Sequence, residues 1–156
     1  MNTNRRTFLK SSVTASALGV AVGAGLITPR AVLAAWPKAA FKATDVNGAL
    51  SSALGSNSLA NSGDIKLKAP DIAENGAVVP VTVTSKIAGT ESISILVAKN
   101  TTPLTAKFNL ASNTEGFIST RIKMGKTSDV VAVIKAGGKL YTAKKEVKVT
   151  IGGCGG

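Results

Sequence analysis

The sequence predicts an all-β fold, an immunoglobulin-like antiparallel β-sandwich that follows one short N-terminal helix. Three observations lead to this fold class. From Ile65 onward, short segments alternate apolar and polar residues, which is the spacing of half-buried strands. Turn-forming residues separate these segments at short intervals. The length of 156 residues is that of one domain once a terminal export segment is set aside.

The helix is expected at residues 45–54. Thr44 or Asp45 can cap its first turn, and Gly55 can end it. Its apolar residues are four positions apart and therefore share one face. These residues are Val46, Leu50 and Leu54.

Seven or eight strands are expected after the helix. Residues 130–134 are nearly all apolar, which suits a buried central strand. Gly137-Gly138 lies between two apolar runs and predicts a tight hairpin. Further turn signals stand at 75–76, 88–90 and 100–103. The expected strands are 65–68, 79–84, 93–97, 108–110, 118–122, 130–134, 140–143 and 147–151.

Histidine is absent, and its absence excludes several classes of function. The chain cannot form a Ser-His-Asp or Cys-His nucleophile, nor a histidine-ligated zinc, copper or haem site. The carboxylates are scattered singly, in no spacing typical of acid–base catalysis or of a metal cage. We therefore expect a protein that is not an enzyme and that needs no cofactor and no metal.

The chain is basic, with a formal net charge of +11. A basic surface can attract nucleic acid, small anions or an acidic partner. Its lysines are spread along the chain, and aromatic residues for base stacking make up only 4% of it. We expect no nucleic-acid partner, and interpret the charge as a solvated face that can concentrate anions or dock an acidic protein.

The first 34 residues have the features of a removable export signal. Arg5 and Arg6 precede Thr-Phe-Leu-Lys, an apolar run follows, and small residues surround the expected cut after Ala34. The twin arginines predict export by the twin-arginine route to the periplasm. A retained membrane anchor is the alternative, but glycines interrupt the apolar run and make it a poor span. Because this route carries folded proteins, we expect a partner subunit that is exported together with the chain.

The segment 152–156 carries the one chemically distinctive group of the chain. Cys154 is its only cysteine, and four of these five residues are glycines. Glycine has the widest backbone freedom and no side-chain bulk, so the segment predicts a slim, flexible arm on the end of a strand. Fully extended, the arm lets Cys154 reach about 10 Å beyond Ile151, far enough to enter a channel of another protein. The arm glycines are Gly152, Gly153, Gly155 and Gly156.

Cys154 is therefore the expected attachment point for a sulfur-containing group, through a bond that thiol exchange can later break. No residue next to it in sequence lowers the pKa of its thiol, so activation is expected from a partner's active site. Three alternatives remain. The chain could be a structural periplasmic sandwich that binds a partner and has an incidental thiol, or the thiol could join two chains by a disulfide. The chain could also be a sulfur transferase that acts alone, but the absence of a general base argues against this.

Three blocks of sequence resemble one known family, the SoxY sulfur-carrier subunits of the Sox thiosulfate-oxidising system. They are residues 148–156 (KVTIGGCGG), 70–81 (PDIAENGAVVPV) and 119–130 (STRIKMGKTSDV). The export signal fits the same family. The resemblance extends over the expected mature chain, residues 35–156.

The resemblance implies the same sandwich fold and a heterodimer with a SoxZ-like subunit. It further implies that the haem enzyme SoxXA joins thiosulfate to Cys154, forming a cysteine S-thiosulfonate. SoxB would then hydrolyse this adduct to release sulfate and leave a persulfide. SoxCD, where present, would oxidise the remaining sulfur. The block 121–129 is a candidate partner-binding region through the resemblance alone.

Overall fold

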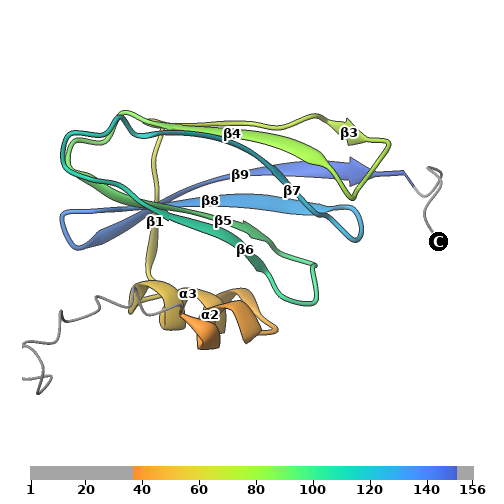
Figure 1. Cartoon of the computed structure of the whole chain (residues 1–156), viewed down its shortest axis with the longest axis horizontal. Coiled ribbons are helices and arrows are strands. Elements are labelled where there is room, and N and C mark those ends of the chain that lie inside the picture. Colours follow the sequence, from red (N-terminus) through yellow and green to blue (C-terminus); the bar gives the residue numbers. More distant parts are fainter. Residues whose placement is uncertain (1–36, 151–156) are drawn as a thin grey trace, which may run out of the picture. The chain divides into compact units, whose positions relative to one another are not determined.

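The computed structural model describes residues 37–150 (Figure 1). Arg5 and Arg6 of the expected export signal lie outside the described residues, as do Cys154 and the glycines of the expected arm. The described part contains two helices and nine strands. The elements are α2 (Lys38–Lys42), α3 (Val46–Leu54), β1 (Leu59–Asn61), β2 (Ile65–Lys68), β3 (Ile72–Ala73), β4 (Val79–Ser85), β5 (Thr90–Val97), β6 (Leu104–Asn109), β7 (Phe117–Ile122), β8 (Ser128–Ala136) and β9 (Lys139–Val149).

The strands form two sheets that face each other, which confirms the predicted β-sandwich. The larger sheet has the order β1-β9-β8-β5-β6, with β3 also paired to β9, and the smaller sheet has the order β2-β4-β7. Apolar side chains from both sheets fill the space between them. The central members of this core are Val79, Val81, Val83, Ile93, Ile95, Val130, Ala132, Ile134 and Val147, which are 0–1% exposed.

The expected helix is present as α3, with the expected caps. The side chain of Asp45 accepts a hydrogen bond from the amide of Gly48, and Gly55 ends the helix in the left-handed conformation. A second helix, α2, precedes it and was not predicted, because its five residues are too few to show a helical period.

The two helices pack on the outer face of the larger sheet and make a third layer (Figure 1). A second buried cluster joins Ala49 and Leu50 of α3 to the sheet residues Leu96, Val133 and Leu140. This layer explains why the middle of β8 is nearly all apolar, as expected for 130–134. The strand is buried on both of its faces, so polar residues have no solvent side to occupy.

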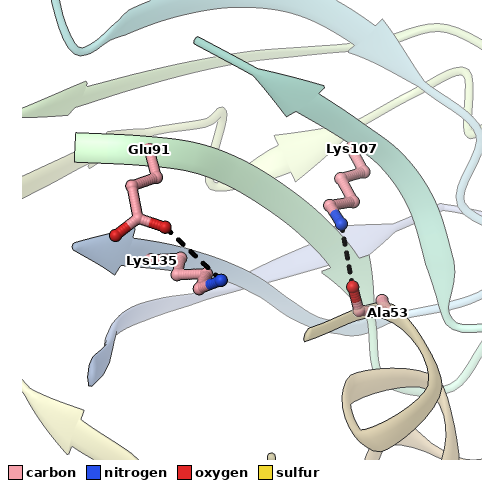
Figure 2. Close-up of polar contacts among 4 residues, drawn as sticks. All are labelled: Ala53, Glu91, Lys107 and Lys135. Carbon is pink, nitrogen blue, oxygen red and sulfur yellow. Dashed lines mark hydrogen bonds and ion pairs between the residues drawn. The ribbon is translucent and has the colours of Figure 1, made fainter. Parts of the chain in front are cut away.

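A lysine from the sheet also ties α3 to the larger sheet. The Nζ of Lys107 on β6 donates a hydrogen bond of 2.8 Å to the carbonyl of Ala53, near the C-terminal end of the helix (Figure 2). Burial, together with the nearby charge of Lys135, lowers the pKa of Lys107 below the ordinary lysine value. Lys135 itself forms an ion pair of 3.4 Å with Glu91.

The structure differs from the expected strands in three respects. The strand expected at 108–110 begins earlier and ends one residue sooner, as β6 (Leu104–Asn109). β1 and β3 were not expected, and both pair in parallel with β9, whereas the other pairings are antiparallel. Strands of three and two residues are too short for alternation to be seen in sequence. The expected strands 140–143 and 147–151 are parts of one strand of 11 residues, β9, which ends at Val149. Thr150 follows the strand, and Ile151 lies outside the described residues. The charged residues between them do not break it, because Lys144 and Glu146 point to solvent on the outer face while Lys145 reaches the β2–β3 connection.

Candidate functional site

The strand β9 leads directly to the segment expected to carry the thiol, so the described part of the site is the end of this strand. Cys154 and the arm glycines Gly152, Gly153, Gly155 and Gly156 lie outside the described residues. The structure shows how the root of that segment is held, through Val149 and Thr150. In Figure 1, β9 ends on the same side of the sandwich as β3 and the β7–β8 connection.

β9 is paired on both sides. β8 pairs with it over the whole of its length up to Val147, which is opposite Ser128. On the other side β1 pairs with residues 140–142, and β3 pairs with Lys148 and Val149. The strand therefore has a hydrogen-bonded neighbour along one edge up to Val147, and on the other edge it is paired at its start and at its end.

The last residues of β9 are held by hydrogen bonds from the β7–β8 connection and from β3 and the residue before it. The hydroxyl of Thr127 accepts a bond of 3.0 Å from the amide of Val149 and donates one of 3.4 Å to the carbonyl of the same residue. The amide of Thr150 donates to the carbonyl of Ala73 at 3.1 Å, and the amide of Lys148 donates to the carbonyl of Asp71 at 3.0 Å. Backbone groups at the strand end, which would otherwise face solvent or be left unpaired, thus have partners.

Gly76 lets the β3–β4 turn approach this end of the strand closely. The amide of Met124 donates a hydrogen bond of 2.7 Å to the carbonyl of Gly76. A Cβ atom at position 76 would overlap the carbonyl oxygen of Met124 and would lie 2.9 Å from Cγ1 of Val149. Position 76 therefore accepts only glycine without movement of the backbone around it.

Lys145 connects the middle of β9 to the segment between β2 and β3. Its Nζ donates a hydrogen bond of 2.6 Å to the carbonyl of Ala69 and forms an ion pair of 3.0 Å with Asp71. The side chain of Asp71 is 89% exposed, so the ion pair contributes little beyond the hydrogen bond.

The side-chain pattern at the end of β9 is the one expected from the sequence. Val147 is fully buried and Val149 packs against the core between the sheets, whereas Lys148 and Thr150 are exposed. The tail therefore begins from a strand whose inward residues are fixed in the core.

An open cleft of about 460 Å³ lies at the same end of the sandwich. It is formed by the β5–β6 loop and the β7–β8 connection, and no carboxylate lines it. Three lysines and two threonines are among its lining residues: Lys99, Lys123, Lys126, Thr101 and Thr102.

Two of the three blocks that suggested the family meet at the root of the tail. Residues 70–81 supply Ala73 and Gly76, and residues 119–130 supply Thr127 and the backbone of Met124. The sequence marked the Asn75-Gly76 turn, but it gave no sign that Thr127 binds Val149. That bond joins residues 22 positions apart, and only the sheet topology brings them together.

Among residues 37–150, no group of three or more Cys, Asp or Glu side chains could hold a metal ion. The same residues contain no helix that is long and apolar enough to cross a membrane. The expectations that the protein is not an enzyme and uses no cofactor rest on the sequence.

The model of the family described as "Sulfur oxidation protein SoxY" matches residues 50–154, a range that reaches from α3 to Cys154. The chain belongs to this family.

A solved structure agrees with the family match. It is that of the sulfur carrier protein SoxY from Chlorobium limicola f thiosulfatophilum, which is 47% identical in sequence with a TM-score of 0.61. The match covers 66% of this chain and 94% of that one. A superoxide reductase (neelaredoxin) from Ignicoccus hospitalis is 18% identical over 55% of this chain and 80% of that one, with a TM-score of 0.48, too low to carry an argument. No curated protein matches the chain.

Proposed function

We propose that this chain is a covalent carrier of sulfur intermediates in periplasmic thiosulfate oxidation, and that the thiol of Cys154 is the attachment point. The observation that carries the proposal is the family match, which includes Cys154 at its end. The firmly held end of β9 supports it. A tail without side-chain bulk that starts from a fixed strand can present its thiol to another protein while the domain stays folded.

The attachment is an oxidation. The Cys154 thiol and thiosulfate form a sulfur–sulfur bond, giving the cysteine S-thiosulfonate, and one proton and two electrons leave. The electrons pass to the haem of a SoxXA-like enzyme. Water then cleaves the bond to the sulfonate group at a SoxB-like enzyme, which releases sulfate and leaves a persulfide on Cys154. A SoxCD-like enzyme, where the cell has one, oxidises that remaining sulfur. This chain supplies the attachment point, and its partners supply the catalysis.

Export and pairing belong to the same proposal. Residues 1–34 would direct the folded chain through the twin-arginine route, by recognition of Arg5 and Arg6, and would then be removed. A SoxZ-like subunit would be exported with it as a heterodimer. The edges of the smaller sheet, β2 and β7, have no strand partner among the described residues, so they offer backbone groups to a second protein.

The first experiment tests whether Cys154 carries the intermediate. Protein from thiosulfate-grown cells should show a mass increase equal to S₂O₃ in intact-mass analysis, and a reducing agent should remove it. Cys154→Ser should abolish this mass and abolish thiosulfate oxidation, with folding and subunit pairing unchanged. Full thiosulfate oxidation by the Cys154→Ser variant would exclude the carrier function and favour a structural scaffold.

A displaced thiol provides the matched control. Gly63 lies in the exposed β1–β2 turn, and a Cβ there meets no atom within 4 Å. In the double variant Cys154→Ser with Gly63→Cys, the thiol is exposed but is no longer on the C-terminal segment. We expect this variant to react with small thiol reagents and to be inactive with the partner enzymes. Restored turnover would show that the position of the thiol is unimportant.

A further inference from the structure

The cleft between the β5–β6 loop and the β7–β8 connection is formed independently of any ligand. The side-chain amide of Asn100 joins its two walls, since Nδ2 donates to the carbonyl of Lys123 at 2.8 Å and Oδ1 accepts from the amide of Gly125 at 3.0 Å. The amide of Lys99 donates to the hydroxyl of Ser128 at 2.9 Å, and Ser128 is 1% exposed. Both loops are therefore fixed to each other and to the sheet.

The lining of this cleft is positively charged. Lys99, Lys123 and Lys126 are exposed, and none of them takes part in the ion pairs found among the described residues. The hydroxyls of Thr101 and Thr102 add hydrogen-bond donors. Three cations on a concave surface without a carboxylate create a positive potential that favours small anions with several acceptor oxygens.

The cleft lies beside the residues that hold the root of the tail. Lys126 precedes Thr127, whose hydroxyl holds Val149 at the end of β9. Cys154 is four positions after Thr150, and a fully extended chain of four residue steps spans at most ~14 Å. An anionic group carried on Cys154 is thus tethered at the end of the sandwich that bears the cleft.

We propose that this cleft is a binding site for sulfur oxoanions, and that it takes the sulfonate end of the adduct carried on Cys154. The second half of this statement rests on the proposed carrier function, whereas binding of a free oxoanion does not. The bound sulfonate is held by the lysine ammonium groups between visits to partner enzymes. Since the attraction is electrostatic and exposed to solvent, added salt weakens it.

The free anion is tested first, on the full chain with Cys154→Ser so that no adduct can form. Thiosulfate is titrated at constant ionic strength while the amide signals of Gly125 and Lys126 are followed by NMR. We expect saturable shifts with a dissociation constant in the millimolar range. Lys123→Gln with Lys126→Gln should weaken binding about three- to tenfold, as expected for the loss of two exposed charge contacts.

Lys66→Gln with Lys68→Gln is the matched control, because it removes the same charge from exposed positions of β2, outside the cleft. This pair should change the affinity less than twofold. Equal weakening by the two pairs would overturn the proposal, since binding would then depend on total charge. Shifts that sodium chloride reproduces at the same ionic strength would overturn it as well.

The tethered anion is tested on the unsubstituted chain. The Cys154 thiolate attacks an inner sulfur of tetrathionate, the central sulfur–sulfur bond breaks, and thiosulfate leaves with the electron pair, which gives the S-thiosulfonate without another oxidant. A neutral adduct made with iodoacetamide is the control. The sulfonate adduct should shift the Gly125 and Lys126 amides and the neutral adduct should not, and the Lys123→Gln, Lys126→Gln pair should abolish the difference.

Three further outcomes are decisive. Free thiosulfate binding without an effect of the adduct would support the oxoanion site and remove its link to Cys154. Absence of both effects, in a protein whose Cys154 still carries adducts in cells, would overturn the cleft proposal and leave the carrier function standing. If the cleft lysines affect pairing with a partner subunit but not oxoanion binding, the cleft is an acidic-protein dock and the proposal is wrong.

Discussion

The two ends of β9 are held in different ways. At its start, the strand follows Gly137-Gly138, and both glycines have positive φ angles of 56° and 73°, as a tight hairpin requires. At its end, Val149 and Thr150 are held by Thr127 and Ala73, and Gly76 packs against Val149. The start of β9 has a tight turn of its own in addition to its pairing with β1, whereas its end depends on segments 22 and more positions away in sequence.

The hairpin half and the tail half of β9 also differ in what covers the outer face of the larger sheet. Leu140, near the hairpin, lies beneath the helices in the second buried cluster. Lys144, Glu146 and Lys148 continue the same face toward the tail, and they are exposed. The helical layer thus stabilises the half of β9 next to the hairpin, whereas β3 and the β7–β8 connection stabilise the half that leads to the tail. Contacts around the tail can then be altered by substitution without disturbing the helical layer.

The largest loss of stability is expected from Gly76→Val. A side chain at this position would overlap the Met124 carbonyl and the Val149 side chain, which lie directly against Gly76. We expect a loss of about 3 kcal/mol in the free energy of unfolding, measured by chemical denaturation, because the core cannot expand to accept the added atoms. Gly63→Ala is the control, since a Cβ at Gly63 meets nothing within 4 Å, and it should change stability by less than about 0.5 kcal/mol. Equal stability of the two variants would show that the close approach at Gly76 is not tight.

A smaller loss of stability is expected from a substitution at the hairpin end of β9. Gly137→Ala places a Cβ in the left-handed region, which costs about 1–2 kcal/mol of stability. Hydrogen exchange should become faster near Leu140 and stay unchanged at Thr150. Gly137→Asn is the conservative variant and should lose less, because asparagine tolerates this conformation better. Faster exchange at Thr150 in Gly137→Ala would mean that the two ends of β9 are coupled and are not held independently.

Thr127→Val tests the tail end of β9 with a more limited loss. It removes the hydroxyl that pairs with both backbone groups of Val149, so we expect about 1 kcal/mol less stability and faster exchange of the Val149 amide. Thr142→Val is the matched control, because the Thr142 hydroxyl only donates one bond, of 3.1 Å, to the carbonyl of Ala132. Unchanged exchange at Val149 in Thr127→Val would show that β3 alone holds the strand end.

The sequence predicted features that depend on local pattern. The caps of α3, the Gly137-Gly138 hairpin, the buried run in β8 and the inward residues Val147 and Val149 all follow from spacing within a few residues. It did not predict the helical layer on the sheet, because one apolar run looks the same whether it is buried on one face or two.

The parts of the site that were missed depend on distant pairing. Thr127 and Gly76 stand in loops whose composition predicts turns and nothing more. Their contacts with Val149 arise because β3 and the β7–β8 connection meet beside β9. The resemblance marked both blocks as typical of the family, without saying that they surround the root of the tail. The expected roles of Cys154 and the arm glycines remain predictions, since these residues lie outside the described part.

The smallest effect on stability is expected from Lys107, which lies on β6 and contacts the end of α3. Its pKa in the folded protein is lowered, mainly by burial and further by Lys135, so in alkaline solution the unfolded chain binds more protons at this position than the folded one. The free energy of unfolding should therefore increase as pH rises from the pKa of Lys107 in the folded protein to the ordinary lysine value. Chemical denaturation across that range should show a weaker rise for Lys107→Met than for the unsubstituted chain, whereas Lys139→Met, at an exposed position next to the hairpin, should leave the rise unchanged. Identical pH dependence in all three proteins would mean that solvent reaches the Lys107 amine freely. The contact with Ala53 would then not hold α3 against the sheet.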